Sequence, residues 1–476
     1  MLTKSHFKKF VACPNEFWLD HHFPQPKQEL SLNDQLRREA GYEVEGFART
    51  LPIFTQPSGY TVEYAKEFVF GELYAKADIV TVNEVSGAID IYEVKSGTNP
   101  EKKYQVDLTF QCIVAEKAGF MVRGAYLVLL DNTYVFDGNL DIERLLKISD
   151  ETEFVEQNKD SISQQIDLCA KILDQPEAEP SLLSYCKGSK LDCQFIRRHF
   201  EIPDYNVSHL FKSGSKKLNA LLDAKVLHLT DIPADFAMTD REAAIVEVER
   251  SQSPFIDSET IRDEIDGLTY PLNFLDYESF NPAIPQFLHT KPYQQMVFQY
   301  SLHSIDERGG EMRHSYHLSR NDGRHPTEEI VERLYEDLNR KIGTVIIWSE
   351  GFEKSRNTEM GEMFPQYAPF LNELNDAVYD LRKVFSRRLY MHPDFRGRDS
   401  IKKVLPVLSD LTYEGMDIAD GLTASIQWYH AATRRGTLDE REKTFADLEA
   451  YCKLDTLAMI VIFEHLRETC CQNRER

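Results

Sequence analysis

Two strand-like apolar runs, one in each half of the 476-residue chain, carry acidic side chains within them. They lie at residues 77–94 and 272–278. Alternate side chains of a strand lie on the same face, so each run is expected to present its charged groups together. Strand-like and helix-like patterns alternate around both runs, which favours an α/β fold in each half. The sequence therefore predicts two acidic sites on two separate sheets.

The length of the chain predicts about three domains. A short stretch of helical patterns, interrupted by glycine and proline, separates the two α/β halves. We expect domains at residues 1–203, 204–266 and 267–476. In the first domain we expect strands at 67–74, 77–82, 88–94 and 123–130, with helices at 107–118 and 150–174.

The apolar runs are far shorter than the ~20 residues that span a bilayer, and the N-terminus lacks the apolar stretch of a signal peptide. Eight cysteines are few for a chain of this length, which argues against a disulfide scaffold. We therefore expect a soluble cytoplasmic protein with no membrane partner.

The formal net charge of -23 argues against a protein that coats nucleic acid by bulk positive charge. It does not exclude a nuclease, because local basic clusters can follow the phosphate backbone. Such clusters occur at residues 212–217 and 382–388. Solvated surface charge is the alternative interpretation of each cluster.

The first acidic site contains Asp78, Glu93 and Lys95. A turn at residues 83–87 would place the strand of Asp78 beside the strand of Glu93. Two carboxylates and a strand carbonyl can hold a hard divalent cation such as Mg²⁺. Lys95, on the same face as Glu93, could orient the attacking water and stabilise charge in the transition state.

This pattern resembles the RecB-like branch of the PD-(D/E)xK nucleases, which have a restriction-endonuclease-like fold. The resemblance implies that Gln111, on the following helix, belongs to the site, although the tyrosine usual four residues later is Ala115 here. It also implies an acid or histidine on an upstream helix. We expect Glu45 in this place, with Glu43 as the alternative.

The cysteines extend the resemblance to the CRISPR-associated iron–sulfur exonuclease family and its helicase–nuclease relatives. In that family one N-terminal and three C-terminal cysteines hold a 4Fe–4S cluster. Here Cys13, Cys186 and Cys193 fit, and His199 stands at the fourth position. Such a set could hold an iron–sulfur cluster or Zn²⁺. The cluster could also have been lost, leaving the cysteines as small buried residues.

The second acidic site begins with Asp276 and Glu278 on one strand face. Tyr451 and Asp455 lie one helical turn apart near the end of the chain. These pairs resemble the first and third motifs of the DnaQ-like exonucleases, which have an RNase H-like fold. For the second motif, an acid after a strand, we expect Glu353, with Asp380 as the alternative.

The resemblance implies that these carboxylates hold two Mg²⁺ or Mn²⁺ ions, and that Tyr451 positions the attacking water. The landmarks at 274–280, 390–395 and 400–406 also resemble a bacterial family of uncharacterised proteins. That family fuses a RecB-like nuclease to a DnaQ-like domain, and the resemblance covers nearly the whole chain.

We therefore expect a metal-dependent nuclease that hydrolyses DNA phosphodiester bonds, exonucleolytically, in DNA repair or defence. One alternative keeps the fold and changes the substrate to RNA. Another makes the chain a DNA-end-binding protein with one or both sites inactive. If only one site is active, we expect it to be the N-terminal one. Protein partners are not indicated by the sequence.

Overall fold

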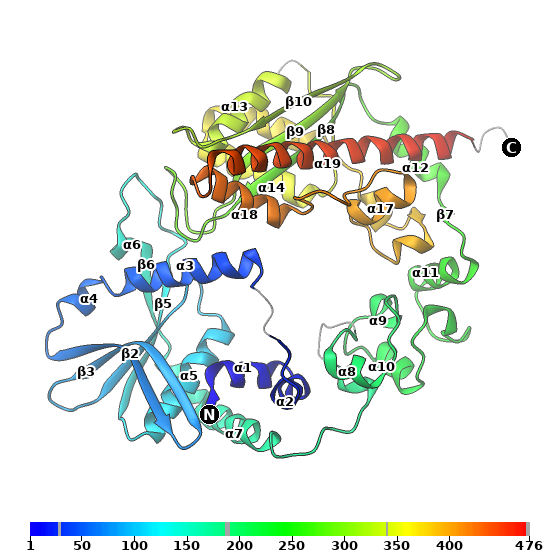
Figure 1. The fold of residues 1–476 in the computed structure, drawn as a ribbon. Helices are drawn as coiled ribbons and strands as arrows, with labels where there is room; N and C mark the ends of the chain where they lie inside the picture. Colours follow the sequence, from blue (N-terminus) through cyan, green and yellow to red (C-terminus); the bar gives the residue numbers. More distant parts are fainter. Residues whose placement is uncertain (27–29, 186–190, 339–340, 473–476) are drawn as a thin grey trace. The chain divides into compact units, whose positions relative to one another are not determined.

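The computed structural model describes residues 1–26, 30–185, 191–338 and 341–472, and these form two compact units with mixed α/β structure (Figure 1). The first unit contains Met1–Asp204, Phe211–Lys225 and Pro282–Tyr293, and the second contains Tyr205–Leu210, Val226–Asn281 and Gln294–Arg476. The segment expected as a linker module, 204–266, is thus divided between the units. A search of the described helices found none with the length and apolarity that a membrane span requires.

The first unit is built on a six-stranded sheet in the order β1-β3-β4-β5-β6, with β2 paired to β3. Its strands are β1 (Leu2–Thr3), β2 (Tyr60–Phe70), β3 (Leu73–Asn83), β4 (Ile89–Val94), β5 (Val122–Leu130) and β6 (Leu146–Asp150). Its helices are α1 (Lys4–Ala12), α2 (Pro14–His22), α3 (Leu32–Ala48), α4 (Pro52–Thr55), α5 (Lys102–Lys117), α6 (Ile142–Leu145), α7 (Thr152–Ile172), α8 (Gln194–His199) and α10 (Lys216–Asp223).

The turn expected between two strands of this sheet is present. Asn83 accepts hydrogen bonds from the backbone amides of Val85 and Ser86, and Gly87 has a positive φ of 70°. The strand expected at 67–74 is wrong, because it crosses a hairpin turn: β2 ends at Phe70 and β3 begins at Leu73. Gly71, with φ of 56°, makes that turn, and its flanking apolar residues concealed it.

Helix α5 packs on one face of this sheet and α3 on the other. The α5 face buries Leu108 and Ile113 against the sheet residue Ile91, whereas Val44 of α3 packs near Tyr92. Because side chains alternate across a strand, Glu93 shares the α5 face with Ile91. The carboxylate of Glu93 therefore lies in the layer between the sheet and α5.

The second unit contains a five-stranded sheet in the order β10-β9-β8-β11-β12 and a two-stranded pair, β13 with β7. Its strands are β7 (Phe255–Ile256), β8 (Leu272–Phe280), β9 (Met296–Ile305), β10 (Met312–Leu318), β11 (Thr344–Ile347), β12 (Val378–Asp380) and β13 (Tyr390–Met391). Its helices are α9 (Val207–Leu210), α11 (Asp240–Ser251), α12 (Ser258–Asp266), α13 (Pro326–Leu338), α14 (Glu350–Met363), α15 (Ala368–Asp376), α16 (Lys383–Ser386), α17 (Ile401–Leu408), α18 (Gly421–Ala432) and α19 (Leu438–Gln472).

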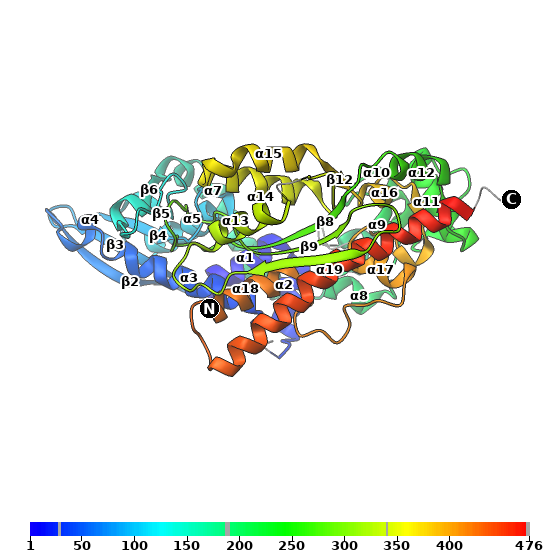
Figure 2. The same ribbon diagram turned by 90° about the horizontal axis from the view of Figure 1, so that it is seen from above.

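The two faces of the five-stranded sheet are covered by different helices (Figure 2). Helices α13, α14 and α15 bury one face against Leu275 and Tyr277 of β8. Helices α18 and α19 lie on the opposite face, where Phe274 of β8 meets Phe463 of α19 with ring centroids 5.6 Å apart. Alternation along β8 places Asp276 and Glu278 on this second face, beneath α19.

Candidate active site

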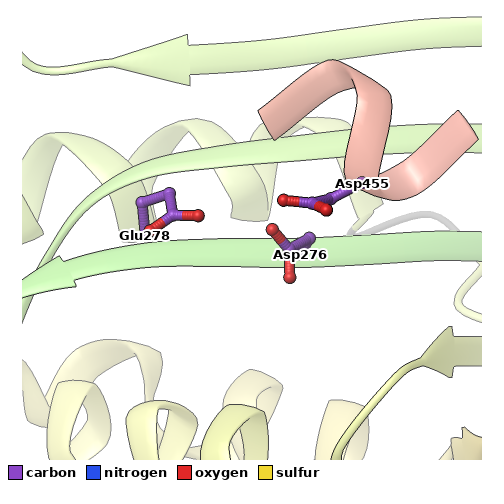
Figure 3. Close-up of side chains that lie close together, drawn as sticks. All are labelled: Asp276, Glu278 and Asp455. Carbon is purple, nitrogen blue, oxygen red and sulfur yellow. The ribbon is translucent and has the colours of Figure 1, made fainter. Parts of the chain in front are cut away.

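Three carboxylates converge between β8 and α19 (Figure 3). Asp276 and Glu278 project from the same face of β8, and Asp455 projects from α19 toward them. One oxygen from each carboxylate lies within 4.8 Å of the other two. Oxygen donors gathered in this way suit a hard divalent cation. Asp276, Glu278 and Asp455 are therefore a possible metal-binding triad.

Burial and mutual repulsion oppose ionisation of these acids. Burial, followed by the charges of Asp455 and Glu278, raises the pKa of Asp276 well above its ordinary value. Burial and then Asp455 likewise raise the pKa of Glu278. Burial raises the pKa of Asp455 to about 6, although hydrogen bonds from Tyr413 and Tyr451 and the charge of Lys402 oppose the increase. A bound cation would offset this repulsion and favour the ionised carboxylates.

The two candidates for the second motif have different surroundings. Glu353 on α14 is 3 % exposed, and its Oε2 atom has no hydrogen-bond partner. Its charge contributes to the raised pKa of Asp276, and burial raises its own pKa to about 8. Both oxygens of Asp380 instead accept backbone hydrogen bonds, from Glu350 at 3.2 Å and Arg382 at 3.1 Å. Glu353 is thus the acid with an unused oxygen near the triad.

Two tyrosines and a lysine surround Asp455. Tyr413 donates a hydrogen bond of 2.5 Å to its Oδ1 atom, and Tyr451 lies near enough to lower the pKa of this carboxylate. Lys402 donates to the Tyr451 hydroxyl at 3.1 Å. The Cys452 thiol, also on α19, lies 3.7 Å from Oδ2 of Asp276. The carboxylates therefore accept from donors on α19 and on the segment between α17 and α18, while Lys402 of α17 holds the Tyr451 hydroxyl.

The residues of the first acidic site also lie close together, and lysine side chains pair with the central acid, Glu93. Continuing the β3–β4 register by one step places Asp78 opposite Glu93, and Asp78 accepts a hydrogen bond of 2.8 Å from the Val94 amide. Glu93 is 1 % exposed and accepts from both Lys95, at 2.6 Å, and Lys4. Burial alone would raise the pKa of Glu93, but Lys95 and Lys4 overcome this effect and hold it at about 2. Burial and then Glu93 raise the pKa of Asp78 to about 7.

Helix α5 completes this cluster. Gln111 donates a hydrogen bond of 2.5 Å to Glu93. Asp107, which is 1 % exposed, accepts from Lys95 at 3.2 Å and from Lys8 at 3.4 Å. Glu93 and Asp107 are thus each matched by ammonium groups, whereas Asp78 accepts from a backbone amide. Charge balance of this kind also occurs in purely structural ion-pair networks.

The upstream acid of this site is better matched by Glu45 than by Glu43. Glu45 on α3 is close enough to Asp78 for its charge to contribute to the raised pKa of that group. It also pairs with Arg49 one turn later on the chain. Glu43 is exposed on the same helix.

Three of the four residues expected at the cysteine site lie in the described part of the chain. Cys13 and Cys193 are buried, free, and lie at the N-caps of α2 and α8. These helices contact each other through a hydrogen bond of 2.9 Å from the Phe195 amide to Glu16. His199 is engaged by Glu177 at 2.6 Å. Cys186 falls outside the described residues, and within them Cys13, Cys193 and His199 do not come close enough together to hold one ion.

Several basic side chains of the 382–388 cluster have acidic partners. Arg382 pairs with Asp399, Lys383 with Glu350 and Arg387 with Glu264. These contacts reduce the positive charge available for a phosphate backbone.

The sequence did not indicate three residues that contact the acids, Lys4, Tyr413 and Cys452, nor Lys402, which contacts Tyr451. Lys402 lies within the landmark 400–406, whose spacing gave no sign of a contact with Tyr451. Cys452 directly follows Tyr451 of the third motif, and this position was the one sign in the sequence that Cys452 lies near the site. Lys4 and Tyr413 lie in stretches with no recognisable motif.

Stabilisation by a divalent cation should increase with pH. The pKa values of Asp455 and Glu353 are raised to about 6 and about 8, above the ordinary carboxylate value of about 4. The metal-free protein is therefore most stabilised by these groups below pH 4 and loses that contribution as the pH rises through 6 and 8. A bound cation replaces the protons, so Mn²⁺ should raise the melting temperature more at pH 8 than at pH 6. Thermal unfolding in Mn²⁺ and in EDTA measures the difference, and an equal increase at both pH values would contradict it.

A family model described as a domain of unknown function (DUF2779) matches residues 273–400. The matched segment contains Asp276, Glu278, Glu353 and Asp380 but ends before Asp455. No curated protein matches the chain.

Proposed function

We propose that the second unit is a metal-dependent nuclease that hydrolyses phosphodiester bonds. The observation that carries this proposal is the approach of Asp276, Glu278 and Asp455 to within 4.8 Å of one another. Burial raises the pKa of all three carboxylates, and repulsion by neighbouring acids adds to the increase for Asp276 and Glu278. Their ionised forms therefore destabilise the folded protein unless a cation is bound. The donor set fits Mg²⁺ or Mn²⁺, and the unpartnered Oε2 of Glu353 offers a further oxygen nearby.

Divalent cations bound at such carboxylates supply activation of water and stabilisation of the leaving 3′ oxygen. The chain itself would supply orientation. Tyr413 fixes one oxygen of Asp455 and leaves the other available as a ligand. The Tyr451 hydroxyl lies beside the same carboxylate and is the group placed to hold the attacking water.

The resemblance to the DnaQ-like exonucleases supports this assignment and extends it to an RNase H-like domain acting on a 3′ end. DNA is the proposed substrate, with DNA repair or defence as the proposed role. Of the basic clusters, the one at 382–388 has most of its members paired with acidic side chains, which reduces the positive charge that it offers to nucleic acid.

A second centre in the first unit is favoured by a separate observation. The PD-(D/E)xK resemblance is supported by hydrogen bonds from Lys95 and Gln111 to Glu93, and by the register that brings Asp78 opposite Glu93. Lys4 competes with any cation for Glu93, however, and this makes the C-terminal triad the better supported metal site. Binding of an iron–sulfur cluster or of Zn²⁺ by Cys13, Cys186, Cys193 and His199 is proposed from the resemblance alone.

The test is cleavage by the purified full-length chain. End-labelled single-stranded DNA, duplex DNA and RNA are incubated with Mg²⁺, with Mn²⁺ or with EDTA. We expect metal-dependent shortening of DNA from the 3′ end. Cleavage of RNA alone would change the substrate class, and DNA binding without cleavage in any metal would overturn the nuclease proposal.

A further inference from the structure

Lys402 lies beside the C-terminal triad with its ammonium group fixed on several sides. It donates a hydrogen bond of 2.5 Å to the carbonyl of Ala419 and one of 3.1 Å to the hydroxyl of Tyr451. The same ammonium lies 5.0 Å from the ring centroid of Tyr451 and 5.4 Å from that of Tyr413. Contacts of a cation with two aromatic faces add to the hydrogen bonds and hold the group in place.

This arrangement determines which way the Tyr451 hydroxyl can donate. An ammonium group has three donors and no acceptor, so the Tyr451 oxygen must accept from Lys402. The single hydroxyl hydrogen of Tyr451 is then directed away from Lys402, and Asp455 lies near enough for Tyr451 to lower its pKa. A water molecule held at Asp455 would meet the same donor.

The contacts around Asp455 form a connected network. Tyr413 donates to Asp455, the rings of Tyr413 and Tyr451 have centroids 6.3 Å apart, and Lys402 lies over both rings. Two of these residues, Lys402 and Tyr413, lie in the α17–α18 region and not on the strand or helix that carries the acids. The orientation of Tyr451 therefore depends on a segment outside the three acidic motifs.

We propose that Lys402 is a positioning residue of the C-terminal site, which orients the Tyr451 hydroxyl toward the attacking water. This proposal rests on the nuclease function proposed above. Lys402 touches no reacting atom in this role and acts through Tyr451. Its ammonium also lies near enough to Glu278 and Asp455 to reduce the repulsion among the carboxylates.

The experiment uses the full-length chain carrying Asp78→Asn, so that cleavage by the first unit does not mask the effect. Lys402→Met, Tyr451→Phe and the double variant are compared, with Lys402→Arg as the conservative replacement. The matched control is Lys403→Met, an exposed lysine on the same helix α17. The measurements are kcat, KM and the affinity for Mn²⁺ from calorimetry.

We expect Lys402→Met to lower kcat about 30-fold or more, because positioned proton donors contribute about 10²–10⁴-fold to such reactions. KM should change little, and Lys402→Arg should recover part of the loss. In the Tyr451→Phe background, Lys402→Met should have almost no further effect, since both variants remove the same interaction. Mn²⁺ should bind Lys402→Met at least as tightly as the parent, because a neighbouring positive charge has been removed.

Several outcomes would overturn the proposal. An equal loss in the Tyr451→Phe background would show that Lys402 acts independently of Tyr451. Weaker Mn²⁺ binding together with a lower melting temperature would show a merely structural role, in which Lys402 only ties α17 to Ala419. A parent chain that cuts no substrate would overturn the nuclease function itself, whereas a cutting parent with an unaffected Lys402→Met variant would overturn this proposal alone.

Discussion

Replacement of Asp276 by asparagine is expected to lower metal-dependent cleavage by the second unit about 10³-fold or more. The change removes one charged ligand of the triad and keeps the size of the side chain, including an acceptor for the Cys452 thiol. Carboxylate-held cations supply several kcal/mol of transition-state stabilisation, and each ~1.4 kcal/mol corresponds to a factor of ten in rate. Initial rates in the Asp78→Asn background measure the loss.

The same substitution should stabilise the metal-free protein. Burial and the charges of Asp455, Glu278 and Glu353 all disfavour an ionised Asp276, so a neutral side chain relieves repulsion at neutral pH. The melting temperature in EDTA should therefore rise, while the affinity for Mn²⁺ falls. Asp410→Asn, at an exposed position, serves as the control and should change neither quantity. Retained cleavage, or a lower melting temperature in EDTA, would contradict the assignment of Asp276 as a metal ligand.

The sequence was most informative where chemistry and strand periodicity coincide. The alternation of Asp276 and Glu278 predicted one shared face, and the structure places both under α19. The turn between Val82 and Ala88 likewise predicted the approach of Asp78 to Glu93. In both cases the relevant contacts follow from local backbone geometry, which short motifs encode.

The residues that escaped prediction depend on tertiary packing. Tyr413 lies in an irregular segment, and its contact with Asp455 is formed only when α17, α18 and α19 pack together. Lys4 reaches Glu93 from the other end of the unit's sequence, through the packing of α1 against α5. The choice between Glu353 and Asp380 also needed the structure, because only the hydrogen bonds show which oxygens are already used.

Replacement of Lys95 by methionine is expected to destabilise the first unit by about 3 kcal/mol, since removal of one partner from a buried ion pair costs about 3–5 kcal/mol. Lys95 bridges Glu93 and Asp107, and each carboxylate is 1 % exposed. Lys4 still neutralises Glu93 in the variant, which limits the loss. Asp107 keeps only the longer contact of 3.4 Å with Lys8, and its Oδ1 atom already has no hydrogen-bond partner. Chemical denaturation measures the change in the free energy of unfolding.

A second substitution separates this structural role of Lys95 from a catalytic one. Lys95→Met leaves the buried Asp107 carboxylate without its close ammonium partner. Asp107→Asn removes that unpaired charge, so the double variant Lys95→Met/Asp107→Asn should recover about half of the lost stability. If the first unit is a nuclease, cleavage in the Asp276→Asn background should stay abolished in the double variant, because the ammonium beside Glu93 is still missing. Lys8→Met is the control: its side chain is 49 % exposed, and its loss should cost less than about 1 kcal/mol. Recovery of both stability and cleavage would show that Lys95 serves the ion-pair network alone, and a full-size loss in Lys8→Met would show that Asp107 depends on Lys8 instead.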